Sequence, residues 1–290
     1  MTRAALITYA PWTDRAGRLS WMKLATFLVC LAPLVWMAWE WRTAAYPNPM
    51  RGLIRETGDW AMRFIALLLA ITPLRYATRW NRPVLLRRML GLTGLFYTLL
   101  HLGLYLVDRK FNLQWIVLEL FWRIYISAGW VATIIFVIMG VTSNDQGIRK
   151  LGSARWNQWH AWVYPAALLS LLHIFILVRL DLYEATVTLG FVAFVIGFRL
   201  LRSRGLQGDP ARLLKLGVGI GLVLAIFEAL FYRWATRVDM MLVLKANFDF
   251  TYRVRPVWWI ISGGLLMACL AFWRRGFKRP EPPRSLQAKA

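Results

Sequence analysis

The chain alternates between long apolar segments and short polar segments rich in arginine and lysine. Eight of the apolar segments approach the length of about 20 residues that a helix needs to cross the hydrocarbon core of a membrane. This pattern predicts an all-α integral membrane protein. The predicted spans cover residues 22–40, 60–77, 89–107, 124–141, 159–178, 185–201, 213–232 and 257–273. A semi-amphipathic stretch at 111–123 is expected to lie along the membrane surface.

Composition and charge agree with a membrane protein. Hydrophobic residues make up 59% of the chain, and the mean hydropathy is +0.48. The formal net charge of +22 does not indicate a nucleic-acid partner, because the basic residues fall in the loops between apolar spans. Of the 36 lysines and arginines, 23 lie on the same side as the N-terminus, which predicts that both termini lie in the cytoplasm. Loop 233–256 is the exception, since it is basic but falls on the other side.

Residues 203–210, SRGLQGDP, contain glycine, aspartate and proline, which can end one helix and start another. They predict a domain boundary. Residues 1–205 then form one domain with six spans and every histidine, and residues 206–290 form a two-helix extension that ends in a disordered tail. The two cysteines, Cys30 and Cys269, lie in different spans and form no covalent haem-attachment motif. Any haem is therefore expected to be bound without a covalent link.

The three histidines of the chain all lie inside or at the edge of apolar spans. A side chain that is costly to bury in lipid usually binds something, and imidazole is a common ligand of haem iron. His101 and His173 are each expected roughly 20 Å from the cytoplasmic start of their helices, at about 1.5 Å per residue. Two imidazoles at matched depth on parallel helices suit a bis-histidine haem. Gly94, Tyr97 and Tyr105 share the predicted helix face of His101.

His160 has no such partner, because arginines occupy the matching depth on the neighbouring helix. It could hold a second haem with water or another side chain, serve a flavin or a quinone, or pack. An ideal helix would place His160 and His173 roughly 140° apart around its axis. Pro165 lies between them and could change that angle.

Several motifs resemble the haem-binding membrane subunits of the protein-methionine-sulfoxide reductase system, the MsrQ or YedZ family of the ferric-reductase-like transmembrane group. The resemblance covers roughly residues 20–205. The motifs are ITPLR at 71–75, RRMLGL at 87–92, FYTLLHLGLYL at 96–106, the pair Thr142-Ser143, and LGxxRWxxWHxxVY at 151–164, followed by His173.

This resemblance implies a six-helix ferric-reductase-like haem-binding bundle, to which the last two helices are additional. It also implies that His101, His160 and His173 match haem ligands of the family, that one or two b-type haems and an FMN are bound, and that the partner is a periplasmic molybdopterin-dependent methionine sulfoxide reductase.

Charged residues near the spans supply further candidates. Arg75 and Arg88 are predicted to face the bundle and to bind haem propionates or a flavin phosphate, since guanidinium offers bidentate bonds to both. Anchoring to anionic lipid is the alternative for any single arginine. Glu119, on the surface stretch, could receive a soluble partner or simply pack. Glu228 is expected to pair with an arginine near the outer boundary, and a proton or quinone role is the alternative.

The resulting hypothesis is an electron-transfer subunit of the bacterial inner membrane that is not itself catalytic. Electrons would enter from quinol or from a cytoplasmic flavin reductase, pass through FMN and haem b, and leave to the periplasmic reductase, where the sulfoxide is reduced. A stand-alone ferric reductase is one rival, although no nucleotide-binding module follows the helices. A proton-coupled transporter is the other, and it predicts a colourless protein.

Overall fold

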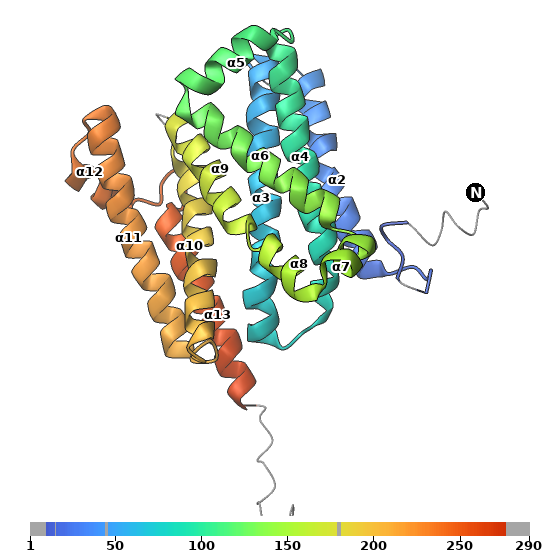
Figure 1. Cartoon of the computed structure of the whole chain (residues 1–290). Coiled ribbons are helices and arrows are strands. Elements are labelled where there is room, and N and C mark those ends of the chain that lie inside the picture. Colours follow the sequence, from blue (N-terminus) through green and yellow to red (C-terminus); the bar gives the residue numbers. More distant parts are fainter. Residues whose placement is uncertain (1–9, 15, 44–45, 179–180, 277–290) are drawn as a thin grey trace, which may run out of the picture.

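The computed structural model describes residues 10–14, 16–43, 46–178 and 181–276, and within them the chain is a bundle of long helices (Figure 1). Eight of these helices are long and apolar enough to cross a membrane, so the chain is a multi-pass membrane protein. The elements are α2 (Trp21–Arg42), α3 (Pro49–Thr78), η1 (Arg82–Leu86), α4 (Arg87–Asp108), α5 (Leu113–Trp122), α6 (Ile124–Thr142), α7 (Asp145–Leu151), α8 (Ser153–His160), α9 (Val163–Leu177), α10 (Tyr183–Ser203), α11 (Pro210–Thr236), α12 (Met240–Ala246) and α13 (Pro256–Gly276).

The two ends of the bundle differ. One end, here called the α5 end, carries α5, α12, the end of α9 and the start of α10. The other, here called the α8 end, carries η1, α7, α8 and the loop between α10 and α11. Because the described spans are even in number, the start of α2 and the end of α13 lie on the same side.

Three apolar clusters hold the helices together. One joins α3, α6, α9 and α10 through residues such as Leu69, Ala166 and Val195. A second joins α2, α3 and α4 around Phe64 and Tyr97, whose rings stack at 5.2 Å. The third attaches α11 and α13 to α10 and to the end of α3. The bundle therefore continues laterally from α10 into the last two spans.

The eight spans predicted from hydropathy are confirmed, but α3 begins eleven residues earlier than the predicted start at residue 60. Its first turns contain Arg51, Arg55 and Asp59, which lower the hydropathy of the segment without stopping the helix. Asn48 caps the helix by accepting a hydrogen bond from the backbone N–H of Arg51, and Pro49 follows at the first helical position. These added turns are part of the site described below.

The predicted helix over 159–178 is interrupted. Helix α8 ends at His160 and α9 begins at Val163. Pro165 lies in the first turn of α9, where its missing N–H is tolerated but would break a helix that continued through it. His160 and His173 therefore belong to different helices, and the angle expected from one ideal helix does not apply.

The predicted extension contains α11 and α13, which cross closely enough that a Cβ on Gly217 would lie 2.7 Å from the Cα of Gly264. Glu228 of α11 is buried and its carboxylate lies 3.6 Å from Arg255, as expected from the sequence. The boundary at 205/206 falls in the loop before α11 and stays a prediction. The disordered tail was predicted for residues that lie outside the described ranges.

Candidate functional site

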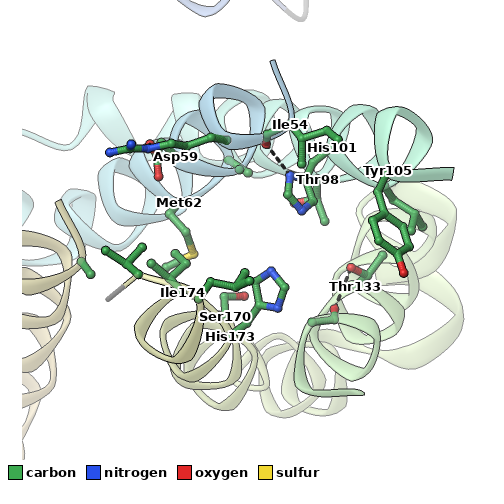
Figure 2. A pocket seen from close by; sticks show the side chains of 18 of the residues that line it. Ile54, Asp59, Met62, Thr98, His101, Tyr105, Thr133, Ser170, His173 and Ile174 are labelled. Atoms are coloured by element: carbon green, nitrogen blue, oxygen red, sulfur yellow. Dashed lines mark hydrogen bonds and ion pairs between the residues drawn. The ribbon is translucent and has the colours of Figure 1, made fainter. Parts of the chain in front are cut away.

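His101 of α4 and His173 of α9 face each other across the inside of the bundle (Figure 2). Their ring centroids are 6.2 Å apart, and their planes are at 90° to each other. Two imidazoles bound to one metal ion through nitrogens about 2 Å from it would have centroids roughly 6 Å apart. The spacing of this pair therefore suits two ligands of a single metal centre.

Each ring is held by a backbone carbonyl of the adjacent helix. Nδ1 of His101 lies 2.7 Å from the carbonyl oxygen of Ile54 on α3, and Nδ1 of His173 lies 2.7 Å from that of Tyr125 on α6. A carbonyl oxygen can only accept, so both Nδ1 atoms carry the proton and donate it. Both Nε2 atoms are then left with a lone pair, which is the form of imidazole that binds a metal.

Glycines give the two rings their space. A Cβ at Gly58 on α3 would lie 3.1 Å from Nδ1 of His101, and a Cβ at Gly129 on α6 would lie 3.0 Å from Nδ1 of His173. Both distances are tighter than ordinary contact for a Cβ atom. A larger residue at either position would push the ring away from its carbonyl.

The two rings line a cavity of about 640 Å³ between α3, α4, α6 and α9. Its volume lies in the range of small-molecule and cofactor sites. Apolar side chains such as Met62, Ile65 and Phe136 form much of the wall, and the hydroxyl groups of Thr98, Thr133 and Ser170 interrupt it. A flat, mostly apolar group with a few polar atoms suits this interior.

The α5 end of the cavity is charged. Arg51, Arg55 and Asp59 of α3 line it together with Asp181 and Glu184. Arg55 pairs with Asp59 at 3.8 Å. Guanidinium groups at the mouth of an apolar cavity are suited to hold carboxylates of a ligand whose body lies inside.

Asp181 connects this mouth to the last two spans, since its carboxylate accepts a hydrogen bond of 2.7 Å from Arg253. That bond holds the pKa of Asp181 below its ordinary value of 3.8. A lowered pKa in the folded state stabilises the protein above the ordinary pKa, and the contribution disappears as the pH falls through the lowered value.

We expect Asp181→Asn to lower the melting temperature in detergent slightly near pH 7, since both partners are half exposed and such pairs contribute at most about 1 kcal/mol. The difference from the unmodified protein should shrink as the pH falls below 3.8 and vanish below the lowered pKa of Asp181. Thermal unfolding from pH 7 down to acid pH measures this difference in melting temperature. Arg253→Gln removes the other partner of the same bond and should give the same result. A difference that grows toward acid pH would contradict the assignment.

His160 is not part of this site. Its ring stacks on Trp156 at 3.7 Å, Nδ1 lies 3.0 Å from the carbonyl oxygen of Trp156, and Nε2 lies 3.1 Å from the hydroxyl of Ser143. Both ring nitrogens thus have protein partners at the α8 end. The role of His160 as a haem ligand stays a prediction.

Arg75 and Arg88 also lie away from the cavity. Arg51 and Arg75 are separated along α3 by roughly 36 Å at about 1.5 Å per residue. Arg75 donates to the side chain of Asn81 at 2.7 Å, and Arg88 pairs with Asp145 at 2.6 Å on the surface. It is Arg87, rather than Arg88, that turns back to α3 and donates to Thr72 at 2.6 Å.

Glu119 on α5 is buried rather than displayed, with 3% of its surface exposed. Tyr105, which lines the cavity, donates a hydrogen bond of 2.5 Å to one of its oxygens. The other oxygen lies 3.2 Å from Arg109 and 3.5 Å from Arg123 as ion pairs. Packing, the second alternative for Glu119, is thus what the structure shows, and it ties α5 to the cavity wall.

The expectation that Gly94, Tyr97 and Tyr105 share the ligand face of α4 is right only for Tyr105. Gly94 packs against Ile65 of α3, and Tyr97 is fully buried and donates to the carbonyl of Cys30 on α2. The sequence did not point to Ile54, Gly58 and Arg55, because the predicted span began at residue 60 and left them outside the helix. The Asn48-Pro49 pair is the signal that could have placed them in a helix.

Comparisons with known proteins agree with this architecture. The family described as ferric reductase like transmembrane component matches residues 57–171. No solved structure matches the chain.

Three relatives are each named protein-methionine-sulfoxide reductase heme-binding subunit MsrQ. The relative from Rhodospirillum rubrum is 36% identical over 190 residues, which are 65% of this chain and 89% of the relative. That from Polaromonas naphthalenivorans is 36% identical over 63% of this chain and 88% of its own length. That from Xanthomonas euvesicatoria is 32% identical over 66% and 90%. With relatives of this identity matched over most of their length, the chain belongs to the MsrQ family of ferric-reductase-like transmembrane proteins.

Proposed function

We propose that this chain is the membrane electron-transfer subunit of a protein-methionine-sulfoxide reductase system and that His101 and His173 ligate a b-type haem. The observation that carries the proposal is the pair of imidazoles, 6.2 Å apart between centroids, with both Nδ1 atoms donating to carbonyls. The names of the MsrQ relatives support the haem and the reductase system.

The residues around the pair fit a haem. The Nε2 lone pairs supply two nitrogen ligands, Gly58 and Gly129 leave room for the rings, and the cavity between them is largely apolar. Arg51 and Arg55 stand where the carboxylates of a ligand would leave the cavity, and we assign them to the propionates in place of Arg75 and Arg88. Haem iron supplies one-electron redox chemistry when bound.

The chain itself would contribute ligation, orientation and exclusion of water. The carbonyls of Ile54 and Tyr125 fix the two rings and raise their basicity. The apolar wall keeps water from the redox centre. Tyr105 connects this wall to α5 at the end that we place on the periplasmic side.

The rest of the electron path belongs to the same proposal. Electrons enter from quinol or from a cytoplasmic flavin reductase, pass through FMN and haem, and leave to a periplasmic molybdopterin-dependent catalytic subunit, where methionine sulfoxide in oxidised proteins is reduced. We place both termini in the cytoplasm of a bacterial inner-membrane protein, a proposal supported by the common side of the start of α2 and the end of α13.

The test is the visible spectrum and haem content of the purified full chain. We expect a reducible b-type spectrum, and reoxidation of the reduced haem when a periplasmic methionine sulfoxide reductase catalytic subunit and methionine sulfoxide are added together. Extracted haem and iron should amount to at least one per chain. A colourless protein free of haem and iron would contradict the proposal and favour the proton-coupled transporter.

A further inference from the structure

Three arginines converge at the α8 end, on the opposite side of the bundle from the haem cavity. Arg75 comes from the last turn of α3, Arg87 from the first turn of α4 and Arg199 from the end of α10. Arg199 donates to the hydroxyl of Tyr164 on α9, and its guanidinium carbon lies 4.7 Å from the centre of that ring. We call Arg75, Arg87, Arg199 and Tyr164 the arginine cluster.

The positive charges of this cluster are close enough to act on one another. Arg75 and Arg199 both interact with Arg87 as like charges. Arg87 is also half-buried between α3 and α4, where its side chain reaches Thr72. Like charges held together near a membrane are unfavourable unless an anion neutralises them.

The described part of the chain provides no carboxylate for this purpose. At the α5 end, Arg55, Arg63, Arg109, Arg123, Arg253 and Arg255 each lie within 4.0 Å of an aspartate or glutamate. By contrast, Arg75, Arg87 and Arg199 contact only neutral groups of the described residues: an amide, a threonine hydroxyl and a phenol. The cluster is thus a set of cations without an internal counter-charge.

Most hydrogen-bond donors of the cluster are not used by the bonds named above. A guanidinium group has five N–H donors, and the bonds named above use one from each arginine. The hydroxyl of Tyr164 accepts from Arg199, which leaves its own proton free to donate. Several free donors on three neighbouring positive charges suit a tetrahedral oxyanion with more than one charged oxygen.

From these contacts we infer that the arginine cluster is a binding site for a phosphate group, carried either by flavin mononucleotide or by an anionic phospholipid. The flavin source rests on the proposed function, whereas the site itself does not. Both sources have access to the cluster, because it lies at the ends of spanning helices, where lipid phosphates and a cytoplasmic flavin can reach it.

Stabilisation of the purified chain by paired probes tests the inference. FMN is compared with riboflavin, which lacks the phosphate, and vesicles of phosphatidylglycerol are compared with vesicles of phosphatidylcholine, whose choline neutralises the phosphate. We expect the melting temperature to rise more with FMN than with riboflavin, or more in phosphatidylglycerol than in phosphatidylcholine. The pair that shows the difference identifies the source.

The variants Arg87→Gln and Arg199→Gln should weaken the apparent affinity for the effective probe about tenfold, as expected for loss of a charge-assisted bond. Arg204→Gln is the control, since Arg204 is an exposed arginine at the same end of the bundle. If the glutamine variants fail to fold, Arg87→Lys and Arg199→Lys, which keep the charge, are measured in their place. Equal stabilisation within both probe pairs, or an unchanged difference in the variants, would overturn the inference.

Failure of this site is distinguishable from failure of the proposed function. The cluster and the cavity lie at opposite ends of the bundle, so Arg87→Gln and Arg199→Gln should leave the haem content unchanged. A full haem spectrum without phosphate-dependent stabilisation rejects the cluster alone, and a colourless protein that still distinguishes the probes rejects the haem proposal alone.

Discussion

Replacing His101 or His173 by alanine is expected to reduce bound haem from about one per chain to less than a tenth of that. Each substitution removes one of two nitrogen ligands from a cavity that offers no second histidine in its place. Loss of the ring also removes the imidazole donor from the carbonyl oxygen of Tyr125, or from that of Ile54, which keeps a bond from the Thr57 hydroxyl. Haem extracted from equal amounts of purified protein, together with the reduced-minus-oxidised spectrum, measures the effect.

Two further variants sharpen this experiment. His160→Ala should keep the haem held by the pair, because His160 bonds to Ser143 and Trp156 and does not line the cavity. Gly129→Ala should lower haem binding with every ligand still present, since its Cβ would lie 3.0 Å from Nδ1 of His173. If both the His101 and the His173 variants retained a full haem complement, the ligand assignment would be wrong.

Glu119→Gln is expected to lower the free energy of unfolding by about 2–3 kcal/mol, somewhat less than the roughly 3–5 kcal/mol typical of breaking a fully buried charge pair. Arg109 and Arg123 remain 33% and 45% exposed, so water screens part of the loss. The hydrogen bond from Tyr105 survives in the amide, but the ion pairs to both arginines do not. Thermal unfolding in detergent measures the change, and hydrogen exchange should show α5 opening first.

Arg88→Gln is the matched control for that loss. Its ion pair with Asp145 is as short as 2.6 Å, but the two side chains are 47% and 68% exposed. Exposed pairs of this kind contribute about 0–1 kcal/mol. Equal losses in the two variants would show that burial does not set the strength of the Glu119 network.

Much of the fold could be predicted from the sequence, because each span is a local run of apolar residues that can be recognised without knowing which helices pack against it. Helix boundaries were harder to predict where polar turns continue a helix. The first three turns of α3 are an example, since hydropathy ends at Trp60 while the helix continues back to Pro49. The interruption between His160 and Val163 was equally hidden, although Pro165 marked the place where the helix could change.

Only part of the site could be predicted, for a related reason. Depth along a helix follows from residue counting, so the matched positions of His101 and His173 could be expected. Which groups surround them depends on which helices are neighbours. Ile54 and Gly58 are 47 and 43 residues before His101 in the chain, and only the packing of α3 against α4 brings them to its ring. The arginines of the cavity mouth depend on the same packing.

The anchoring of the two rings has a consequence for the speed of electron transfer. A carbonyl of α3 holds His101 of α4, and a carbonyl of α6 holds His173 of α9, so each ring is fixed to a second helix. Ligands that are already in place have little distance to move when iron changes its oxidation state. If the two rings ligate haem iron as proposed, this backbone anchoring would lower the reorganisation energy, and an electron could enter and leave without rearrangement of the helices.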